Sequence, residues 1–157
     1  MRHPAVLLAT WFGAGLLPGA PGSWASLAAL PFAFAWRSLF GAAGLALAAV
    51  LAFAAGCWAA QRVIAATGAD DPGAIVIDEV AAQWLVLLTA PMEPLAWALA
   101  FLLFRLFDIV KPWPVSWVDR RVRGGLGVML DDVLAAGYAA LALALLLALG
   151  GEIGVRP

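Results

Sequence analysis

Long runs of hydrophobic residues, separated by short polar segments, dominate the pattern of this chain. Residues 38–61 (SLFGAAGLALAAVLAFAAGCWAAQ) contain no charged residue, and residues 133–151 (VLAAGYAALALALLLALGG) contain none either. A helix needs about 20 apolar residues to cross the ~30 Å hydrocarbon core of a bilayer. Both segments are therefore predicted to be transmembrane helices.

The N-terminal part of the chain contains shorter apolar segments. Residues 5–17 are too short to span a bilayer and predict an interfacial or partly inserted helix. In the turn-rich sequence LPGAPGSWAS that follows, Ser23 is the predicted N-cap of an apolar helix that ends near Arg37. Free N–H groups at such a helix start attract phosphate, which makes Ser23 a candidate phosphate-binding residue.

Residues 74–90 and 95–110 predict a helical hairpin. Both segments are apolar and of helical length, and the turn between them is Pro91-Met92-Glu93-Pro94. Each arm is roughly 24 Å long at ~1.5 Å per residue. If the turn lies at one membrane face, Asp78-Glu79 and Arg105-Asp108-Lys111 all lie near the opposite face.

The acidic residues gather at that opposite end. Nine of the ten Asp and Glu residues lie between residues 70 and 132, and all of these except Glu93 map to it. Most basic residues share this end, whereas Arg37 and Arg156 fall at the other. Because an excess of Lys and Arg marks the cytoplasmic side of a membrane protein, the polar end is predicted to face the cytoplasm. The basic residues at this end are Arg2, Arg62, Arg105, Lys111, Arg120, Arg121 and Arg123.

Composition supports a membrane protein. Hydrophobic residues make up 65% of the 157 residues and charged residues 12%, against about half and a quarter in an ordinary soluble domain. The length suits a single domain, residues 1–157, and the net charge of −1 gives no indication of nucleic-acid binding. We predict an all-α integral membrane helical bundle with short or re-entrant helices and a polar site at its cytoplasmic face.

The sequence FRLFDIVKPWP, residues 104–114, places three charged side chains on one helix face. Arg105, Asp108 and Lys111 are spaced by three residues and fall within about a third of the circumference. One interpretation is a local ion pair whose cations reach the lipid headgroups. The other is a phosphate clamp, in which Arg105 offers a planar fork and Lys111 a point charge.

Asp78 and Glu79 are adjacent in an apolar run, where ionised groups are costly. One interpretation is that they face headgroups or pair with Arg62 or Arg105. The other is a cation site, to which the loop acids at 70–71 also contribute. Carboxylates that converge repel one another unless a cation lies between them, and Mg²⁺ takes oxygen ligands while keeping positions open for phosphate and water.

Asp131 and Asp132 precede the last apolar run. One Asp is enough to cap a helix and complement its dipole, so the other is a candidate metal ligand, and the sequence leaves open which. Asp119 is interpreted as a partner of Arg120 or Arg123. The only histidine lies near the N-terminus, which disfavours a Ser-His or Cys-His pair. Carboxylates and basic residues at a membrane face indicate metal-assisted hydrolysis or transfer at a lipid phosphate.

Four stretches of the chain, in order, resemble the phosphatidylglycerophosphatase A family of bacteria. They are GAGLLPGAPGSWASLAALP, DPGAIVIDEVAAQWLVL, FRLFDIVKPWPVSWVDRRVRGGLGVMLDD and the final apolar helix, and they extend from about Gly13 to Leu149. The resemblance implies a multi-pass, Mg²⁺-dependent phosphatase of the bacterial inner membrane, a phosphoric monoester hydrolase of phospholipid biosynthesis. Its substrate would be the lipid phosphatidylglycerophosphate and its product phosphatidylglycerol.

The resemblance also implies which residues form the site. The acidic signature of the family falls on Asp78, Glu79, Asp108, Asp131 and Asp132, and the basic signature on Arg105 and Lys111. Two positions depart from the pattern: Ala82 stands where glycine is frequent, and Asp71 lies in a loop where some relatives carry histidine. We hypothesise that Asp78, Glu79, Asp108 and Asp131 or Asp132 hold Mg²⁺, while Arg105, Lys111 and Ser23 bind the phosphate.

The nucleophile stays open between metal-activated water and an aspartate, of which Asp108 is the first candidate. Two rival functions also stay open. An enzyme like the CDP-alcohol phosphatidyltransferases would need a denser acidic signature than this chain has. A small membrane protein that binds or transports cations would place its acids near the bilayer midplane. The sequence does not predict the oligomeric state or the number of metal ions.

Overall fold

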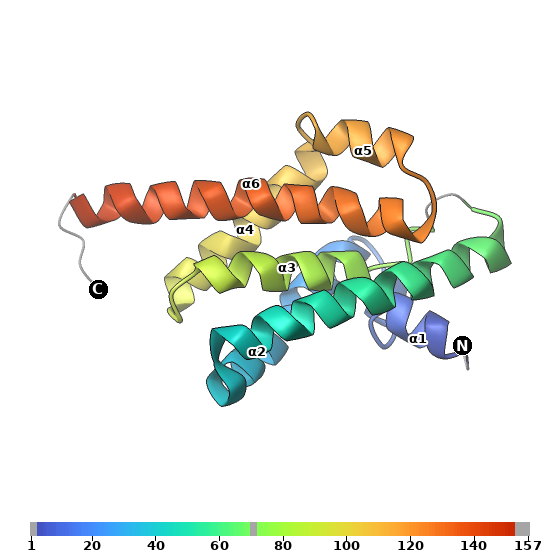
Figure 1. Cartoon of the computed structure of the whole chain (residues 1–157), viewed down its shortest axis with the longest axis horizontal. Helices are drawn as coiled ribbons and strands as arrows, with labels where there is room; N and C mark the ends of the chain where they lie inside the picture. The colour runs from blue at the N-terminus through green and yellow to red at the C-terminus, as the bar shows by residue number, and fades with distance from the viewer. Residues whose placement is uncertain (1–2, 70–71, 153–157) are drawn as a thin grey trace.

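The computed structural model of the chain describes residues 3–69 and 72–152, and in this part it is all α-helical, which confirms the predicted class. Figure 1 shows the helices in chain order. They are α1 (Pro4–Ala9), the short 3-10 helix η1 (Ala14–Leu16), α2 (Pro21–Thr67), α3 (Ile77–Thr89), α4 (Pro94–Val110), α5 (Val115–Arg121) and α6 (Gly124–Glu152).

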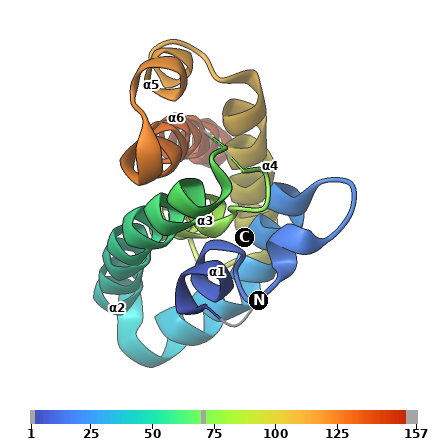
Figure 2. The same cartoon turned by 90° about the vertical axis from the view of Figure 1, so that its right-hand side faces the viewer.

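The helix α2 is two helices joined by a sharp bend at Gly41. Gly41 has φ 70° and ψ −173°, which is not helical, and glycine adopts positive φ at little cost because it has no Cβ atom. The chain reverses at this bend, so that residues 42–67 run back along the bundle in the opposite direction to residues 21–40 (Figures 1 and 2). The break that we predicted after Arg37 is therefore four residues too early, because helical geometry continues through residues 38–40.

Two predicted helix caps are wrong. The N-cap of α2 is Ala20, and no side chain of residues 3–69 or 72–152 caps that end, so Ser23 lies inside the first turn rather than at the cap. Pro21 begins the helix instead, since its fixed φ suits the first helical position. Asp131 and Asp132 do not cap α6, which already begins at Gly124. The Gly125 N–H there donates to Oε1 of Gln61 at 2.9 Å, so α2 supplies the partner that the start of α6 needs.

The helix α3 lies in the middle of the bundle, where it contacts α2, α4 and α6 (Figure 2). The connection from α2 to α3, the connection from α5 to α6 and the start of α6 share one end of the molecule, at the right of Figure 1, and the connection from α4 to α5 lies at the top of the view. The Gly41 bend, the turn between α3 and α4 and the end of α6 share the other. The predicted hairpin of α3 and α4 is thus confirmed, with its polar ends away from its turn.

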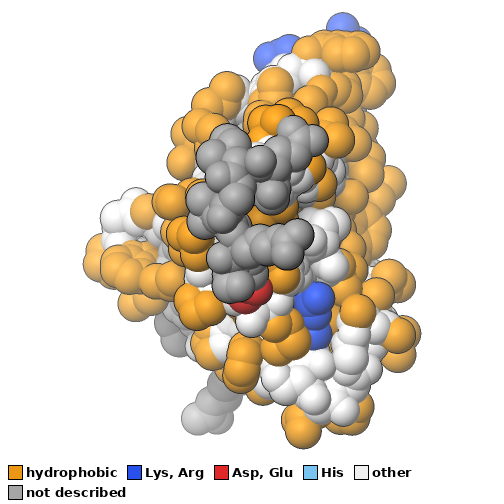
Figure 3. Space-filling model, turned by 90° about the vertical axis from the view of Figure 1, so that its left-hand side faces the viewer, with side chains coloured by type: hydrophobic (Ala, Val, Ile, Leu, Met, Phe, Trp, Pro, Cys, Tyr) orange, Lys and Arg blue, Asp and Glu red, His pale blue; other side chains and the backbone are white. Residues whose placement is uncertain are grey.

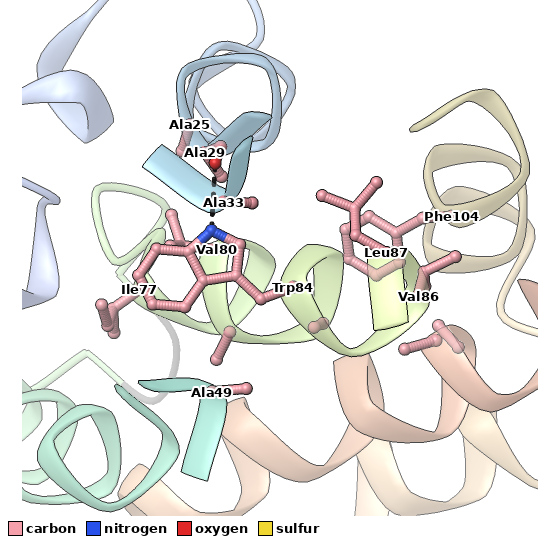
Figure 4. Close-up of a cluster of buried hydrophobic side chains, with 14 of the residues drawn as sticks. Ala25, Ala29, Ala33, Ala49, Ile77, Val80, Trp84, Val86, Leu87 and Phe104 are labelled. Atoms are coloured by element: carbon pink, nitrogen blue, oxygen red, sulfur yellow. Dashed lines mark hydrogen bonds between the residues drawn. The ribbon is translucent and has the colours of Figure 1, made fainter. Parts of the chain in front are cut away.

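Small residues allow the first half of α2 to approach α3 closely. Ala25, Ala29 and Ala33 repeat every four residues and are fully buried in the core (Figure 4). Small side chains at such spacing let two helix backbones approach. The indole Nε1 of Trp84 on α3 then donates to the Ala29 carbonyl oxygen at 3.0 Å, which fixes the register of the two parallel segments.

The outer surface of the bundle is strongly hydrophobic. Within the part of the chain that the structure describes, two helices, α2 and α6, are long and apolar enough to cross a membrane, and only 17% and 22% of their most apolar windows are buried in the molecule. Leu39 in α2 and Leu141 in α6 are examples of the exposed hydrophobic side chains on these helices, with exposed fractions of 74% and 70%. The end with the Gly41 bend is also mainly hydrophobic and shows few charged side chains (Figure 3). A core helix of a soluble protein would be covered, so this surface suggests a membrane environment.

Replacing Arg37 by Met is expected to lower the free energy of unfolding by about 2 kcal/mol, because bonds from a charged donor to buried acceptors are worth that much. The Arg37 guanidinium Nη1 donates to the carbonyl oxygens of Leu87 at 2.5 Å and Ala90 at 2.7 Å, at the end of α3. Unfolding in mixed detergent micelles would measure the loss. Arg120→Met, on the exposed side of α5, serves as the control. Equal stability of both variants would contradict the role assigned to Arg37.

Candidate functional site

Three carboxylates from two helices converge near the polar end of the bundle. Asp78 and Glu79 stand in the first turn of α3, and Asp132 stands two turns into α6. One carboxylate oxygen from each residue lies within 4.8 Å of the other two. Asp78 is 9% exposed and Asp132 4%, so these carboxylates have lost most of their hydration. We call these three residues the carboxylate cluster.

The carboxylate cluster retains buried oxygen atoms that no neighbouring group satisfies. Oδ1 of Asp78, Oε2 of Glu79 and Oδ2 of Asp132 have no hydrogen-bond partner among the described residues. Buried polar atoms are almost always paired, and converging carboxylates repel one another. A hard divalent cation that takes oxygen ligands resolves both costs at once. The donor set therefore fits a cation such as Mg²⁺, which makes this cluster a candidate metal centre.

Arg105 lies behind the carboxylate cluster and links it to Asp108. Its Nη1 atom is 2.7 Å from Oδ2 of Asp108, three residues along α4, and 3.7 Å from Oε1 of Glu79. Gly22, in the first turn of α2, packs closely against the pair of Arg105 and Glu79, since a Cβ atom built there would lie 3.2 Å from Arg105 Nη1. In this structure the guanidinium binds carboxylates of the protein itself.

Lys111 forms the second charged group of the site. It follows the last turn of α4, and its Nζ atom donates to Oδ1 of Asp119 at 2.5 Å and to Oδ2 of Asp131 at 2.7 Å. Burial lowers the pKa of Lys111, but the bonds and charges of these two carboxylates outweigh burial and raise the pKa above its ordinary value. Lys111 therefore remains a cation. Asp131 pairs with it, whereas Asp132 belongs to the carboxylate cluster.

The carboxylate cluster and Lys111 border a common cavity of about 180 Å³. Its charged lining includes seven of the residues discussed above together with Arg123, and its small or apolar lining comes largely from α2 and α6. Ser23 and Arg105, both predicted to bind phosphate, are outside this lining, whereas Gly22 is part of it. The seven residues are Asp78, Glu79, Asp108, Lys111, Asp119, Asp131 and Asp132.

The sequence interpretation missed Asp119 and Gly22. Asp119 was expected to pair with a neighbouring arginine, but it accepts a hydrogen bond from Lys111, eight residues earlier. The signal was the Pro112-Trp113-Pro114 segment, which separates α4 from α5, the short helix that carries Asp119. Asp70 and Asp71, proposed as additional acids, lie outside the described residues.

Comparison with known proteins gives a consistent result. The family model "Phosphatidylglycerophosphatase A" matches residues 7–147. A Haemophilus influenzae protein named phosphatidylglycerophosphatase A is 42% identical over 140 residues, covering 88% of this chain and 86% of the relative. The Escherichia coli protein of the same name is 38% identical over 146 residues, covering 89% and 81%.

A third relative carries a different name. This Bacteroides thetaiotaomicron protein is 39% identical over 156 residues, covering 88% of this chain and 92% of its own, and its name proposes a phosphatidylinositol-3-phosphatase. No solved structure matches the chain.

Proposed function

The chain belongs to the phosphatidylglycerophosphatase A family, and from this premise we propose that it is a Mg²⁺-dependent lipid phosphatase. The proposed reaction is hydrolysis of phosphatidylglycerophosphate to phosphatidylglycerol and inorganic phosphate. The observation that carries the proposal is the buried carboxylate cluster with its unsatisfied oxygen atoms, which opens on the same cavity as the Lys111 ammonium. A cation site beside a fixed positive charge suits a phosphate monoester.

We assign the metal-holding role to Asp78, Glu79 and Asp132, with Asp108 beside them in the cavity lining. When bound, Mg²⁺ supplies positive charge against the phosphate oxygens in the transition state. Arg105 holds Glu79 and Asp108 in place from behind through its contacts with both side chains. Both contacts involve the Nη1 atom of Arg105, so the phosphate clamp that the sequence suggested for Arg105 stays a prediction beside this role.

Lys111 is the residue that we assign to the terminal phosphate. Lys111 lines the cavity together with both carboxylates that bind its ammonium group, and its positive charge would stabilise the negative charge that builds on the phosphate oxygens. Hydrolysis breaks the bond between phosphorus and the glycerol oxygen, and that oxygen takes up a proton as it leaves. The attacking group is either water or Asp108, which lines the cavity 2.7 Å from Arg105. A covalent adduct on Asp108, trapped with a phosphate analogue, would identify the second route.

We also propose that the protein is a multi-pass protein of the bacterial inner membrane, with the site facing the cytoplasm. The exposed apolar surfaces of α2 and α6 support membrane insertion. The basic residues Arg120 and Arg121 lie exposed on α5, at the end that carries the cavity. An excess of such residues is typical of the cytoplasmic side. At this end a lipid headgroup reaches the carboxylate cluster while its acyl chains stay in the bilayer.

Phosphate release from phosphatidylglycerophosphate in detergent micelles tests the proposal. Release is expected with Mg²⁺ and is expected to stop when EDTA removes the cation. Phosphatidic acid and phosphatidylinositol 3-phosphate serve as competing substrates, the second because of the name of the Bacteroides relative. Faster release from either would change the assigned substrate. Release of CMP from a CDP-linked lipid would favour a transferase, and cation flux into liposomes without any phosphate release would favour a transporter.

A further inference from the structure

Lys111 has an unusual backbone conformation at the end of α4. Its φ of 46° lies in the left-handed region, which residues with a Cβ atom rarely adopt. The conformation is held by the Lys111 N–H, which donates to the Phe107 carbonyl oxygen at 2.9 Å. Such outliers persist where surrounding contacts fix them, and they are frequent at functional sites. The backbone thus sets the direction in which the lysine side chain leaves the helix.

Two carboxylates from different helices then fix the far end of the side chain. Asp119 reaches Nζ from α5 and Asp131 reaches it from α6. An ammonium group carries three N–H donors, and these two contacts use two of them. Because Lys111 lines the cavity, the remaining donor is available to a ligand bound there.

The helix that carries Asp119 is itself anchored. Val115 and Val118 of α5 are buried, and α5 packs against α6. The Tyr138 hydroxyl of α6 donates to the Trp113 carbonyl oxygen at 2.8 Å, just before α5 begins. The carboxylate of Asp119 therefore approaches Lys111 from a fixed support rather than from a free loop.

We propose that Asp119 is a positioning residue, which holds the Lys111 ammonium so that its third N–H points to the substrate phosphate. The proposal rests on the proposed phosphatase function and adds to it a residue on α5. An isolated pair of exposed charges contributes about 0–1 kcal/mol and fixes little. Here the side chains of Lys111 and Asp119 are 29% and 37% exposed, but the same ammonium is also bound by Asp131, whose side chain is 7% exposed. Asp119 therefore supplies the second of two contacts that together fix a largely covered cation.

Lys111 is the only lysine in the sequence, which permits a direct measurement of its environment. The acylation rate of its amine, followed by peptide mass spectrometry, is compared between the parent, Asp119→Ala and Asp119→Asn. The amide oxygen of Asn keeps a hydrogen-bond acceptor, whereas Ala removes it. Glu93→Gln removes one negative charge at the opposite end of the molecule and is the matched control. The same four proteins are assayed for KM, kcat and inhibition by inorganic phosphate.

Asp119→Ala is expected to accelerate acylation of Lys111 and to raise both KM and the inhibition constant of phosphate about tenfold, the effect of one charge-assisted hydrogen bond. Asp119→Asn is expected to lie closer to the parent, and Glu93→Gln to equal it. Unchanged acylation, or faster acylation with an unchanged KM and inhibition constant, would overturn the positioning role. If Asp119→Ala does not fold, Asp119→Asn is judged by the same criteria.

If the parent protein releases no phosphate from any lipid, the proposed function fails. The acylation rates then still decide whether Asp119 fixes Lys111, so the two failures are distinguishable.

Discussion

Replacing Asp78 by Asn is expected to abolish Mg²⁺-dependent phosphate release, with a fall in kcat/KM of about a thousandfold, the effect of ~4 kcal/mol of lost electrostatic stabilisation. Asp78 contributes one of the three carboxylates that lie within 4.8 Å of one another, and its Oδ1 atom has no partner among the described residues. The amide has nearly the shape of the carboxylate but no negative charge. The substitution therefore removes cation affinity and leaves the packing of α3 in place.

Thermal unfolding separates this expectation from simple loss of structure. Without Mg²⁺, Asp78→Asn is expected to be at least as stable as the parent, because it relieves repulsion between buried like charges. Adding Mg²⁺ is expected to raise the Tm of the parent but not that of the variant, since a ligand that binds only the folded state stabilises it. Glu93→Gln should behave like the parent in both assays. Parent-like activity of Asp78→Asn at every Mg²⁺ concentration would remove the carboxylate cluster from the mechanism.

The gathering of the acids at one end of the bundle could be predicted from the sequence. The lengths of the segments at 74–90 and 95–110 and the proline turn between them require a hairpin, so Asp78-Glu79 and Asp108 had to lie at the same end. The structure has this hairpin as α3 and α4. Helix length and turn position are local properties, and a single sequence reports them well.

The pairing of charges within the site could not be predicted in this way. Which carboxylate Lys111 binds depends on the path of the chain after Pro112 and on the rotation of α6, and neither is a local property. The sequence therefore left Asp131 and Asp132 equivalent, whereas in the structure Asp131 pairs with Lys111 and Asp132 lies beside Asp78 and Glu79. The start of α6 was also missed, because its partner Gln61 is distant in the sequence.

Gly22→Ala is expected to lower kcat/KM by about a hundredfold while the fold is retained, a loss typical of a reacting group displaced by ~1 Å. A Cβ atom at this position would lie 1.9 Å from Oε1 of Glu79, so the carboxylate has to move. The atom that gives way is the end of a flexible side chain, so the helices need not separate. We therefore expect a small change in Tm and an increase in the Mg²⁺ concentration that gives half-maximal activity.

Gly137→Ala is the matched control for this expectation. Gly137 lies within α6, where an added Cβ atom would meet no heavy atom of the described residues within 4 Å. The activity and the Mg²⁺ dependence of Gly137→Ala should therefore equal those of the parent. The comparison separates the effect of any new methyl group on a helix from the effect of displacing Glu79. If Gly22→Ala retains full activity at low Mg²⁺, Glu79 tolerates the displacement and is not a metal ligand, which would reduce the cation site to Asp78 and Asp132. If activity is lost but recovers at high Mg²⁺, the close approach of α2 at Gly22 determines how tightly the carboxylate cluster holds its cation.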